Sequence, residues 1–290
     1  MDLCFLSANI NSFILDPLSH EFMRKALFMS SLVAAVCGFL SSYLTLKGWA
    51  LMGDAVSHSV MPGVVVAYAL GLPFSLGAFI FGVGSVALIG FVKQKSRVKE
   101  DTVIGLVFTG FFALGIVLIS KIKSNIDLHS ILFGSPLGIS LSDVKQTVLI
   151  SLLVLVLLSV FRKDLILYCF DPRHAKTVGI SVVFLHYLLL TCLSLAAVVG
   201  LQSVGIVLVV AMLITPGATA YLLTDQFDTM TIISVISAVI SSLLGIYFSF
   251  WFDLETGGSI VLVQTFIFLF AFLFAPRYGI FKLQKLFSNY

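Results

Sequence analysis

Long uninterrupted apolar runs are the feature that most constrains the fold of this chain. A helix needs about 20 residues to cross a hydrocarbon core about 30 Å thick. Nine segments reach or approach that length: residues 22–46, 54–72, 76–92, 102–122, 144–161, 182–199, 204–223, 230–252 and 259–274. The runs are continuous and do not alternate, so they predict helices and not the strands of a barrel. We expect an all-α, polytopic transmembrane helical bundle with eight or nine spans.

Composition agrees with a membrane protein and excludes several classes of function. Of the 290 residues 59% are hydrophobic and 11% charged, and the mean hydropathy is +1.12. We therefore expect residues 1–290 to form a single transmembrane domain. The formal charge of +3 is too small and too dispersed for nucleic-acid binding. The four cysteines stand singly, without CxxC spacing, so the sequence indicates neither a disulfide framework nor a thiolate zinc site.

Basic residues gather in three segments between and after the apolar runs, at residues 93–99, 162–176 and 277–285. Cytoplasmic loops of membrane proteins carry an excess of Lys and Arg, so we expect these segments, and with them the C-terminus, in the cytoplasm. Nine spans would leave the N-terminus outside, although Arg24 and Lys25 argue mildly against that. The chain begins with acidic residues where a signal peptide would be basic, so we expect this segment to be retained.

The strongest candidate for a functional site is Asp54 with His58. An acidic residue in a membrane span costs roughly 2.5–3.5 kcal/mol on insertion scales, which by default indicates function. Residues four apart lie on one face of a helix, so this pair can present a carboxylate oxygen and an imidazole nitrogen to one ion. Such donors suit a divalent cation of borderline hardness, such as Mn²⁺, Fe²⁺ or Zn²⁺. Spacing alone gives equal weight to Asp54 as a helix N-cap after Gly53.

Two predicted spans carry a proline followed by a glycine. Pro62 and Gly63 lie in the second span, and Pro216 and Gly217 lie in the seventh. Proline lacks a backbone N–H and frees a carbonyl group, while glycine lets a neighbouring helix come close. We expect both spans to be broken or kinked at these positions, because paired interruptions can mark a transport pathway.

The sequence lacks the motifs of several enzyme classes. It contains no GxxxxGK[ST] phosphate loop, no HExxH zinc motif and no GxSxG nucleophile motif. We therefore expect a protein that is not an enzyme and does not itself hydrolyse ATP. Residues 121–140 include an apolar piece that is too short to cross a membrane and contains Gly134, Pro136 and Gly138. We expect a re-entrant or interfacial element there.

Four stretches of the chain resemble a known family. They are GDAVSHSVMPG at residues 53–63, KEDTVIGLVF at 99–108, FDPRHAKTVGI at 170–180 and LQSVGIVLVVAMLITPGATAYLLTD at 201–225. Together they look like the membrane permease subunit of bacterial metal-ion ABC importers of the ABC-3 type, which take up manganese, zinc or chelated iron. The resemblance implies a type II ABC importer permease in the bacterial cytoplasmic (inner) membrane. It also implies a divalent metal as cargo and no permanently bound cofactor.

The resemblance further implies partners and residue roles. Two permease copies, identical or closely related, would form the pathway, cytoplasmic ATPase subunits would power it, and an extracytoplasmic solute-binding protein would deliver the metal. Asp54 and His58 match the family's Asp-x-x-x-His and would line the metal path. Residues 162–180 would form the cytoplasmic coupling segment that docks on the ATPase. Its matching positions are Asp171, His174, Ala175 and Gly179.

Three alternatives stay open. An ABC permease for a metal chelate or a cobalamin-like cofactor would need a wider, more apolar path and no paired ligands. An intramembrane hydrolase would use Asp54 or His58 on a water molecule, which the absent motifs disfavour. A proton-coupled secondary transporter would have no use for a docking segment at residues 162–180.

Overall fold

The computed structural model describes residues 16–121 and 141–275, and all regular structure in these two stretches is helical. This confirms the predicted all-α class. The re-entrant element expected beyond Lys121 and the basic segment at 277–285 lie outside the described residues. The helices are α2 (Glu21–Lys47), α3 (Ala50–Ser59), α4 (Met61–Ala69), α5 (Phe74–Lys95), α6 (Glu100–Lys121), α8 (Leu141–Val160), α9 (Arg162–Phe170), α10 (Pro172–Thr177), α11 (Val182–Val204), α12 (Ile206–Leu223), α13 (Phe227–Phe252) and α14 (Thr256–Phe274).

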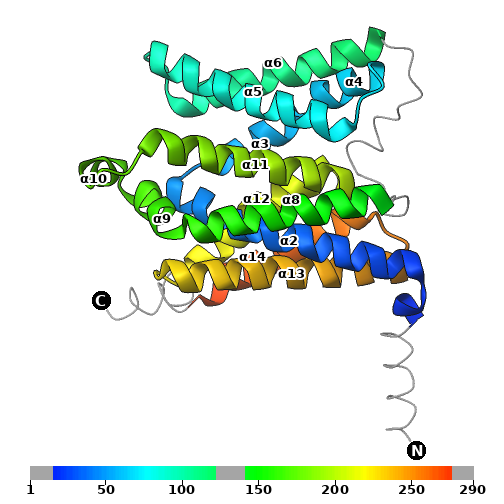
Figure 1. The fold of residues 1–290 in the computed structure, drawn as a ribbon. Helices are drawn as coiled ribbons and strands as arrows, with labels where there is room; N and C mark the ends of the chain where they lie inside the picture. The colour runs from blue at the N-terminus through cyan, green and yellow to red at the C-terminus, as the bar shows by residue number, and fades with distance from the viewer. Residues whose placement is uncertain (1–15, 122–140, 276–290) are drawn as a thin grey trace, which may run out of the picture.

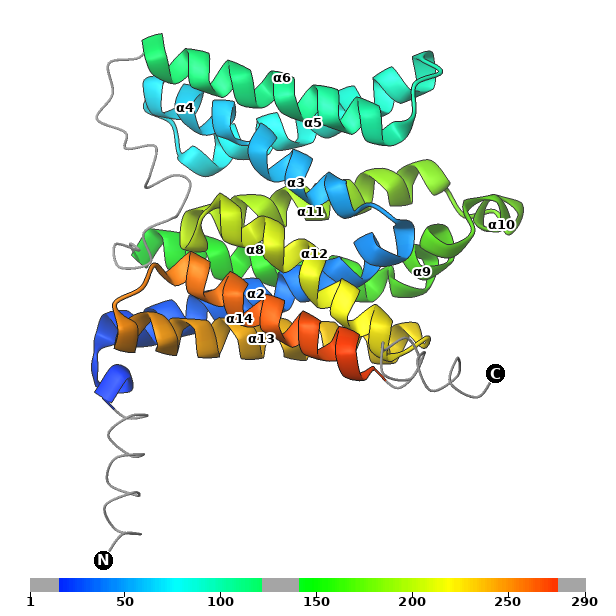
Figure 2. The same cartoon turned by 180° about the vertical axis from the view of Figure 1, so that it is seen from behind.

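The long helices lie side by side in two groups (Figures 1 and 2). Helices α4 to α6 form one group, and α2, α8 and α11 to α14 form the other. Helix α2 is the largely buried centre of the second group and packs against α8, α11, α12 and α13. Helix α3 lies between the groups and contacts α6 on one side and α11 and α12 on the other. The short helix α10 projects from one end of the bundle, which we call the α10 end.

Small residues bring the central helices close together. The Ser234 hydroxyl of α13 donates a hydrogen bond to the Gly38 carbonyl of α2 at 2.6 Å. A Cβ atom at Gly38 would stand only 3.0 Å from the Ser234 carbonyl oxygen, so the two backbones meet here. Lipid tails are as apolar as leucine, and helices in a membrane therefore associate through close packing and interhelical hydrogen bonds. The α2–α13 contact has both features.

The described helices establish a multi-pass membrane protein. Six of them, α2, α5, α6, α11, α13 and α14, are long and apolar enough to cross a membrane. Helices α8 and α9 add a seventh candidate if they count as one span, although they meet at an angle of 70°. The apolar piece of α12, Leu208–Leu223, is shorter than a full span. The predicted second span is divided between α3 and α4.

The chain passes from α3 to α4 next to Pro62. Helix α3 ends at Ser59, and Pro62 stands in the first turn of α4, where a missing N–H has no intrahelical partner to lose. Helix α6 packs against this junction, since a Cβ at Gly115 would be 3.3 Å from the Pro62 nitrogen. Gly63 lies directly against Gly77 of α5. The Pro62–Gly63 pair therefore sits where three helices touch.

The sequence predicts a break or a kink at Pro216, and the structure shows no break there. Helix α12 runs without interruption from Ile206 to Leu223, with Pro216 inside it. The neighbouring helix bonds the backbone on both sides of the proline: the Ser41 hydroxyl of α2 donates to the Ile214 carbonyl at 3.3 Å and accepts from the Gly217 N–H at 2.9 Å. Backbone groups disturbed by a proline in a membrane helix are commonly satisfied in this way. Gly217 allows it, because any Cβ there would overlap Ser41.

We predict that Gly63→Ala destabilises the protein by about 1–3 kcal/mol, as overpacking does in a tight contact. The added Cβ would overlap the Gly77 carbonyl group and stand 2.9 Å from the Phe81 Cβ. The matched control is Gly84→Ala on α5, where nothing lies within 4 Å of the new Cβ. Thermal unfolding of the detergent-solubilised protein measures both variants. Equal melting temperatures for the two would show that the α4–α5 contact is not tight.

Candidate metal site

Asp54 and His58 share one face of α3 in the structure. The His58 Nε2 atom lies 3.3 Å from the Asp54 Oδ1 atom. Helix α3 begins at Ala50 with Trp49 as its N-cap, so Asp54 is in the second turn of the helix. The N-cap interpretation of Asp54 is therefore wrong, and capping does not account for a carboxylate at this position.

The distance within this pair matches the geometry of two ligands on one ion. Donors that bind a metal at about 2.1 Å stand roughly 3.0–3.4 Å apart when the bond angles lie between octahedral and tetrahedral values. The observed 3.3 Å lies in that range. The same contact is an ion pair when His58 is protonated.

Two phenylalanines of α6 hold the imidazole in place. The His58 ring meets the rings of Phe108 and Phe112 edge to face, with centroid separations of 5.0 and 5.3 Å. The Nδ1 atom of His58 is buried and has no hydrogen-bond partner among the described residues. These contacts leave Nε2, on the Asp54 side, as the nitrogen that is available to a ligand.

The rest of α3 is anchored on both sides of the pair. The Ser57 hydroxyl donates to the Gly53 carbonyl at 2.8 Å, and Gly53 lies against Leu213 of α12. Ser59 forms a hydrogen bond of 2.7 Å with Ser85 of α5. The backbone that carries Asp54 and His58 is thus fixed against both helix groups.

One chain supplies only part of a coordination sphere. In residues 16–121 and 141–275 no group of three or more His, Cys, Asp or Glu side chains is close enough to hold a metal ion. The side chains of His58 and Asp54 are 20% and 34% exposed, so their own chain does not enclose them. A cation at this pair would take its remaining ligands from water or from another subunit.

The predicted coupling positions surround α10, and three of them shape the backbone. The Asp171 Oδ1 atom caps α10 by accepting from the Arg173 and His174 N–H groups at 2.9 and 3.0 Å. The hydrogen bond from the His174 N–H is the main cause that lowers the pKa of Asp171 below its ordinary value. Ala175 is buried, and Gly179 adopts φ +87°, a left-handed conformation that favours glycine.

His174 has a different role from these three residues. Its side chain is exposed on α10, as are those of Arg173 and Lys176. Since α10 projects from the bundle, these side chains form a basic surface that another protein can reach (Figure 1). The structure therefore separates positions that hold the shape of α10 from positions that face outward.

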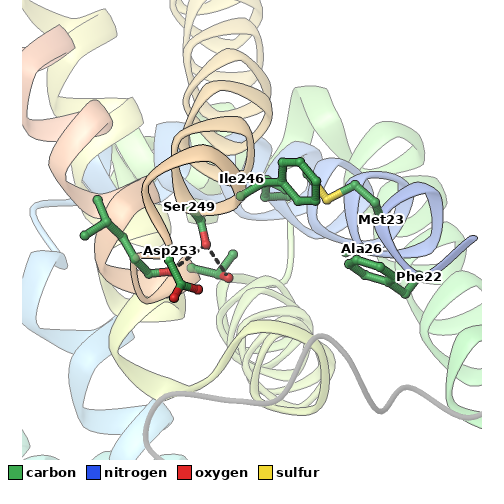
Figure 3. A pocket seen from close by; sticks show the side chains of 9 residues that line it. Phe22, Met23, Ala26, Ile246, Ser249 and Asp253 are labelled. Atoms are coloured by element: carbon green, nitrogen blue, oxygen red, sulfur yellow. Dashed lines mark hydrogen bonds between the residues drawn. The ribbon is translucent and has the colours of Figure 1, made fainter. Parts of the chain in front are cut away.

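A pocket lies at the opposite end of the bundle, between the start of α2 and the turn from α13 to α14 (Figure 3). Phe22 and Met23 form its apolar side, and Ser249 and Asp253 stand across from them. The Ser249 hydroxyl donates to the Leu254 carbonyl at 2.7 Å. Next to this turn, Glu255 accepts from the first N–H groups of α14, so its carboxylate caps a helix. We assign no ligand to the pocket.

Sequence reasoning missed a cluster at the α10 end that involves α9. Lys47 and Trp49 lie beside Tyr168 and His186 there. Only His186 stands out in the sequence, as a histidine at the start of an apolar run. Positions so far apart in the chain show no common pattern, so only the tertiary structure brings them together.

Comparison with known proteins identifies the family. The model of the ABC 3 transport family matches residues 19–275. The chain belongs to this family. It is a membrane permease subunit of an ABC transporter, and it is not itself an enzyme.

Its relatives within the ABC 3 family span almost the whole chain. The manganese transport system membrane protein MntB of Synechocystis sp. is 54% identical over 267 residues, 92% of this chain and 87% of that protein. The chelated iron transport system membrane protein YfeD of Yersinia pestis is 46% identical over 263 residues, 91% of this chain and 89% of that protein. A solved structure described as PsaBC from Streptococcus pneumoniae in complex with Fab has a TM-score of 0.86 at 40% identity, covering 95% of this chain and 99% of that chain.

We predict that Asp171→Ala frays α10 and that Asp171→Asn does not. Asparagine accepts the same N-cap hydrogen bonds, whereas alanine leaves the Arg173 and His174 N–H groups without an acceptor. Trypsin cleavage after Arg173 and Lys176 in the solubilised protein should therefore be several-fold faster in the alanine variant. Since the pKa of Asp171 is lowered, the cap persists at neutral pH and is lost only as the pH falls through that lowered value. Identical cleavage of both variants would contradict the capping role.

Proposed function

We propose that this chain is the permease subunit of an ATP-driven ABC importer that moves a divalent metal ion, manganese, zinc or iron, across the bacterial inner membrane. The observation that carries the proposal is the Asp54–His58 pair, a carboxylate and an imidazole 3.3 Å apart on a helix between two helix groups. The names of relatives support the choice of cargo, since they are described as manganese and chelated iron transport proteins.

A second permease copy would complete the coordination. One copy presents two donors, and a twofold axis beside α3 would bring two more, which makes four. Mixed oxygen and nitrogen ligands suit Mn²⁺, Fe²⁺ and Zn²⁺, and the choice among them depends on geometry and on which metal is available. Binding has to remain weak enough for release, because a site that holds the ion tightly would stop transport.

We infer nine membrane crossings. The six long helices would each make one, α8 would make a seventh, α12 an eighth and the broken pair α3–α4 a ninth. Helix α9, turned by 70° from α8, would then lie along the membrane surface. Basic side chains gather at the α10 end, which supports a cytoplasmic α10 end and, by the number of crossings, a cytoplasmic C-terminus. They are Lys47, Lys93, Lys95, Arg97, Lys99, Arg162, Lys163, Arg173 and Lys176.

This orientation assigns the partners to opposite ends. Residues 162–180, with α10 projecting, would dock on the cytoplasmic ATPase subunits as the coupling segment of a type II importer permease. The extracytoplasmic solute-binding protein would deliver the ion at the other end. The whole chain would act as one transmembrane permease domain, and ATP binding would shift it between outward-facing and inward-facing states.

A permease for a metal chelate is the second candidate, because two relatives are described as chelated iron transport proteins. A chelator supplies the ligands of its own metal, so this function would not need Asp54 and His58 as donors. Removal of the Asp54 charge therefore separates the two candidates.

We predict that Asp54→Asn abolishes metal accumulation by a metal-uptake-deficient bacterium that carries the complete system. The amide is a weaker ligand for a divalent ion and has no charge to offset the cation. Elemental mass spectrometry of the cells measures manganese, iron and zinc together. The matched control is Asp253→Asn, since Asp253 is exposed and adopts φ +51°, which asparagine accepts readily.

Three results of that experiment differ in meaning. Loss of one metal in Asp54→Asn but not in Asp253→Asn supports the ligand role and identifies the cargo. Uptake of a chelate at an unaltered rate in Asp54→Asn moves the chelate permease to first place. A wild-type system that is assembled but raises no metal contradicts the proposal.

We predict that transport stops when the partner ATPase carries a substitution that blocks hydrolysis. The chain has no GxxxxGK[ST] phosphate loop, so the energy has to come from another subunit. Uptake of radioactive manganese or iron into cells measures this, with the wild-type ATPase as control. Uptake that persists and follows the proton gradient would instead indicate a secondary transporter.

A further inference from the structure

Four side chains from four parts of the chain meet where α9 ends and α3 begins. They are Lys47 at the end of α2, Trp49 before α3, Tyr168 on α9 and His186 on α11. We call this cluster the α9–α3 junction. It lies at the α10 end and connects the docking segment to the helix that carries the Asp54–His58 pair.

Lys47 donates a hydrogen bond to a carbonyl group near the end of α9. The Tyr168 carbonyl would ordinarily accept from the N–H of residue 172, but Pro172 has none. The Lys47 ammonium group donates to this carbonyl at 3.2 Å and lies 4.1 Å from the centre of the Tyr168 ring. The Lys47 ammonium group also lies beside the C-terminal ends of α2 and α9, where the helix dipoles favour positive charge.

Tyr168 extends the contact to α11 and to the start of α3. Its hydroxyl lies 2.9 Å from His186 Nδ1 in a hydrogen bond. The His186 ring meets the Trp49 ring edge to face at 5.3 Å. Trp49 is buried and is the N-cap of α3. Its backbone N–H donates to the Leu44 carbonyl of α2 at 2.8 Å. Tyr168 is therefore linked through His186 to the residue from which α3 starts.

The other side of the junction leads directly to α10. Asp171 ends α9 and caps α10, so the two helices share one residue and move together. The far end of α9 is tied to α13 by the ion pair between Arg162 and Asp228. A displacement of α10 would then turn α9 about its Arg162 end and act most strongly at Tyr168. Asp54 is five residues after Trp49, or about 7.5 Å along α3 at the rise of an α-helix.

We propose that Lys47 and Tyr168 are positioning residues that transmit movement of the docked α10 through Trp49 and His186 to α3, and so set the geometry of the Asp54–His58 pair. The proposal rests on the transport function proposed above. Neither residue touches the ion in this mechanism. Their loss should lower the amount of metal moved for each ATP hydrolysed. The ATPase subunits should still hydrolyse ATP, and the Asp54–His58 pair should still be present.

The test uses the complete transporter, with ATPase subunits and solute-binding protein, reconstituted in proteoliposomes. Manganese uptake and ATP hydrolysis are measured on the same sample, and their ratio is the readout. Lys47→Met removes the cation and keeps the chain length, while Tyr168→Phe removes only the hydroxyl bonded to His186. Tyr221→Phe is the control, since Tyr221 is exposed on α12. We expect the ratio to fall about threefold or more in Lys47→Met, less in Tyr168→Phe, and not in the control.

A second readout does not depend on the cargo. Leu51 is exposed on α3, one turn before the metal pair, and Leu51→Cys introduces a thiol there. We expect ATP binding to change its labelling rate in the otherwise wild-type protein, and Lys47→Met to reduce that change. If the wild type imports no metal but the labelling responds in this way, the junction stands and the metal function fails.

The proposal is overturned if Lys47→Met and Tyr168→Phe assemble with their partners and keep both the wild-type uptake ratio and the ATP-dependent labelling change. That result would make the junction a packing contact. A variant that lowers uptake and hydrolysis in equal proportion would also count against it, because the energy transfer would then be intact.

Discussion

Hydrocarbon offers no hydrogen bonds, so a chain that crosses it many times has to satisfy its polar atoms inside its own bundle. Ser41 does this at Pro216, where one hydroxyl serves a carbonyl and an N–H of the neighbouring helix. Between α13 and α2, the Ser234 hydroxyl donates a hydrogen bond to the Gly38 carbonyl. Because each of these contacts needs two backbones at close range, the small residues that permit it also determine which helices are neighbours.

The same constraint explains why the Asp54–His58 pair is unusual. Two ionisable side chains stay partly exposed on a helix that lies between two groups of a membrane bundle. Such groups are retained where they face a partner or an aqueous path, since exposure to lipid would be costly. Helix α3 ends at Ser59, and α4, which follows it after Val60, packs against α5 and α6. The pair thus sits next to the junction between α3 and α4.

Much of this arrangement could be predicted from the sequence, but not all of it. Hydropathy alone predicts the helical class and the approximate position of every long helix in residues 16–121 and 141–275. The spacing of Asp54 and His58 predicts a shared face, yet it allows an N-cap equally well, and only the start of α3 at Ala50 excludes that role. Pro216 predicts a break or a kink; no break occurs, and Ser41, far away in the sequence, bonds the backbone on both sides of the proline. Local rules fail here because the compensating group comes from another helix.

The sequence by itself determined that this chain forms membrane helices, belongs to a family of transport permeases and carries a potential ligand pair, because hydropathy, motif and spacing are properties of neighbouring residues. Only the tertiary structure decided which helices touch and which polar groups are paired. Lys47 meets Tyr168 across 121 positions of sequence, where α2 ends beside the end of α9. Contacts of this kind depend on the folded path of the whole chain, which no local pattern encodes.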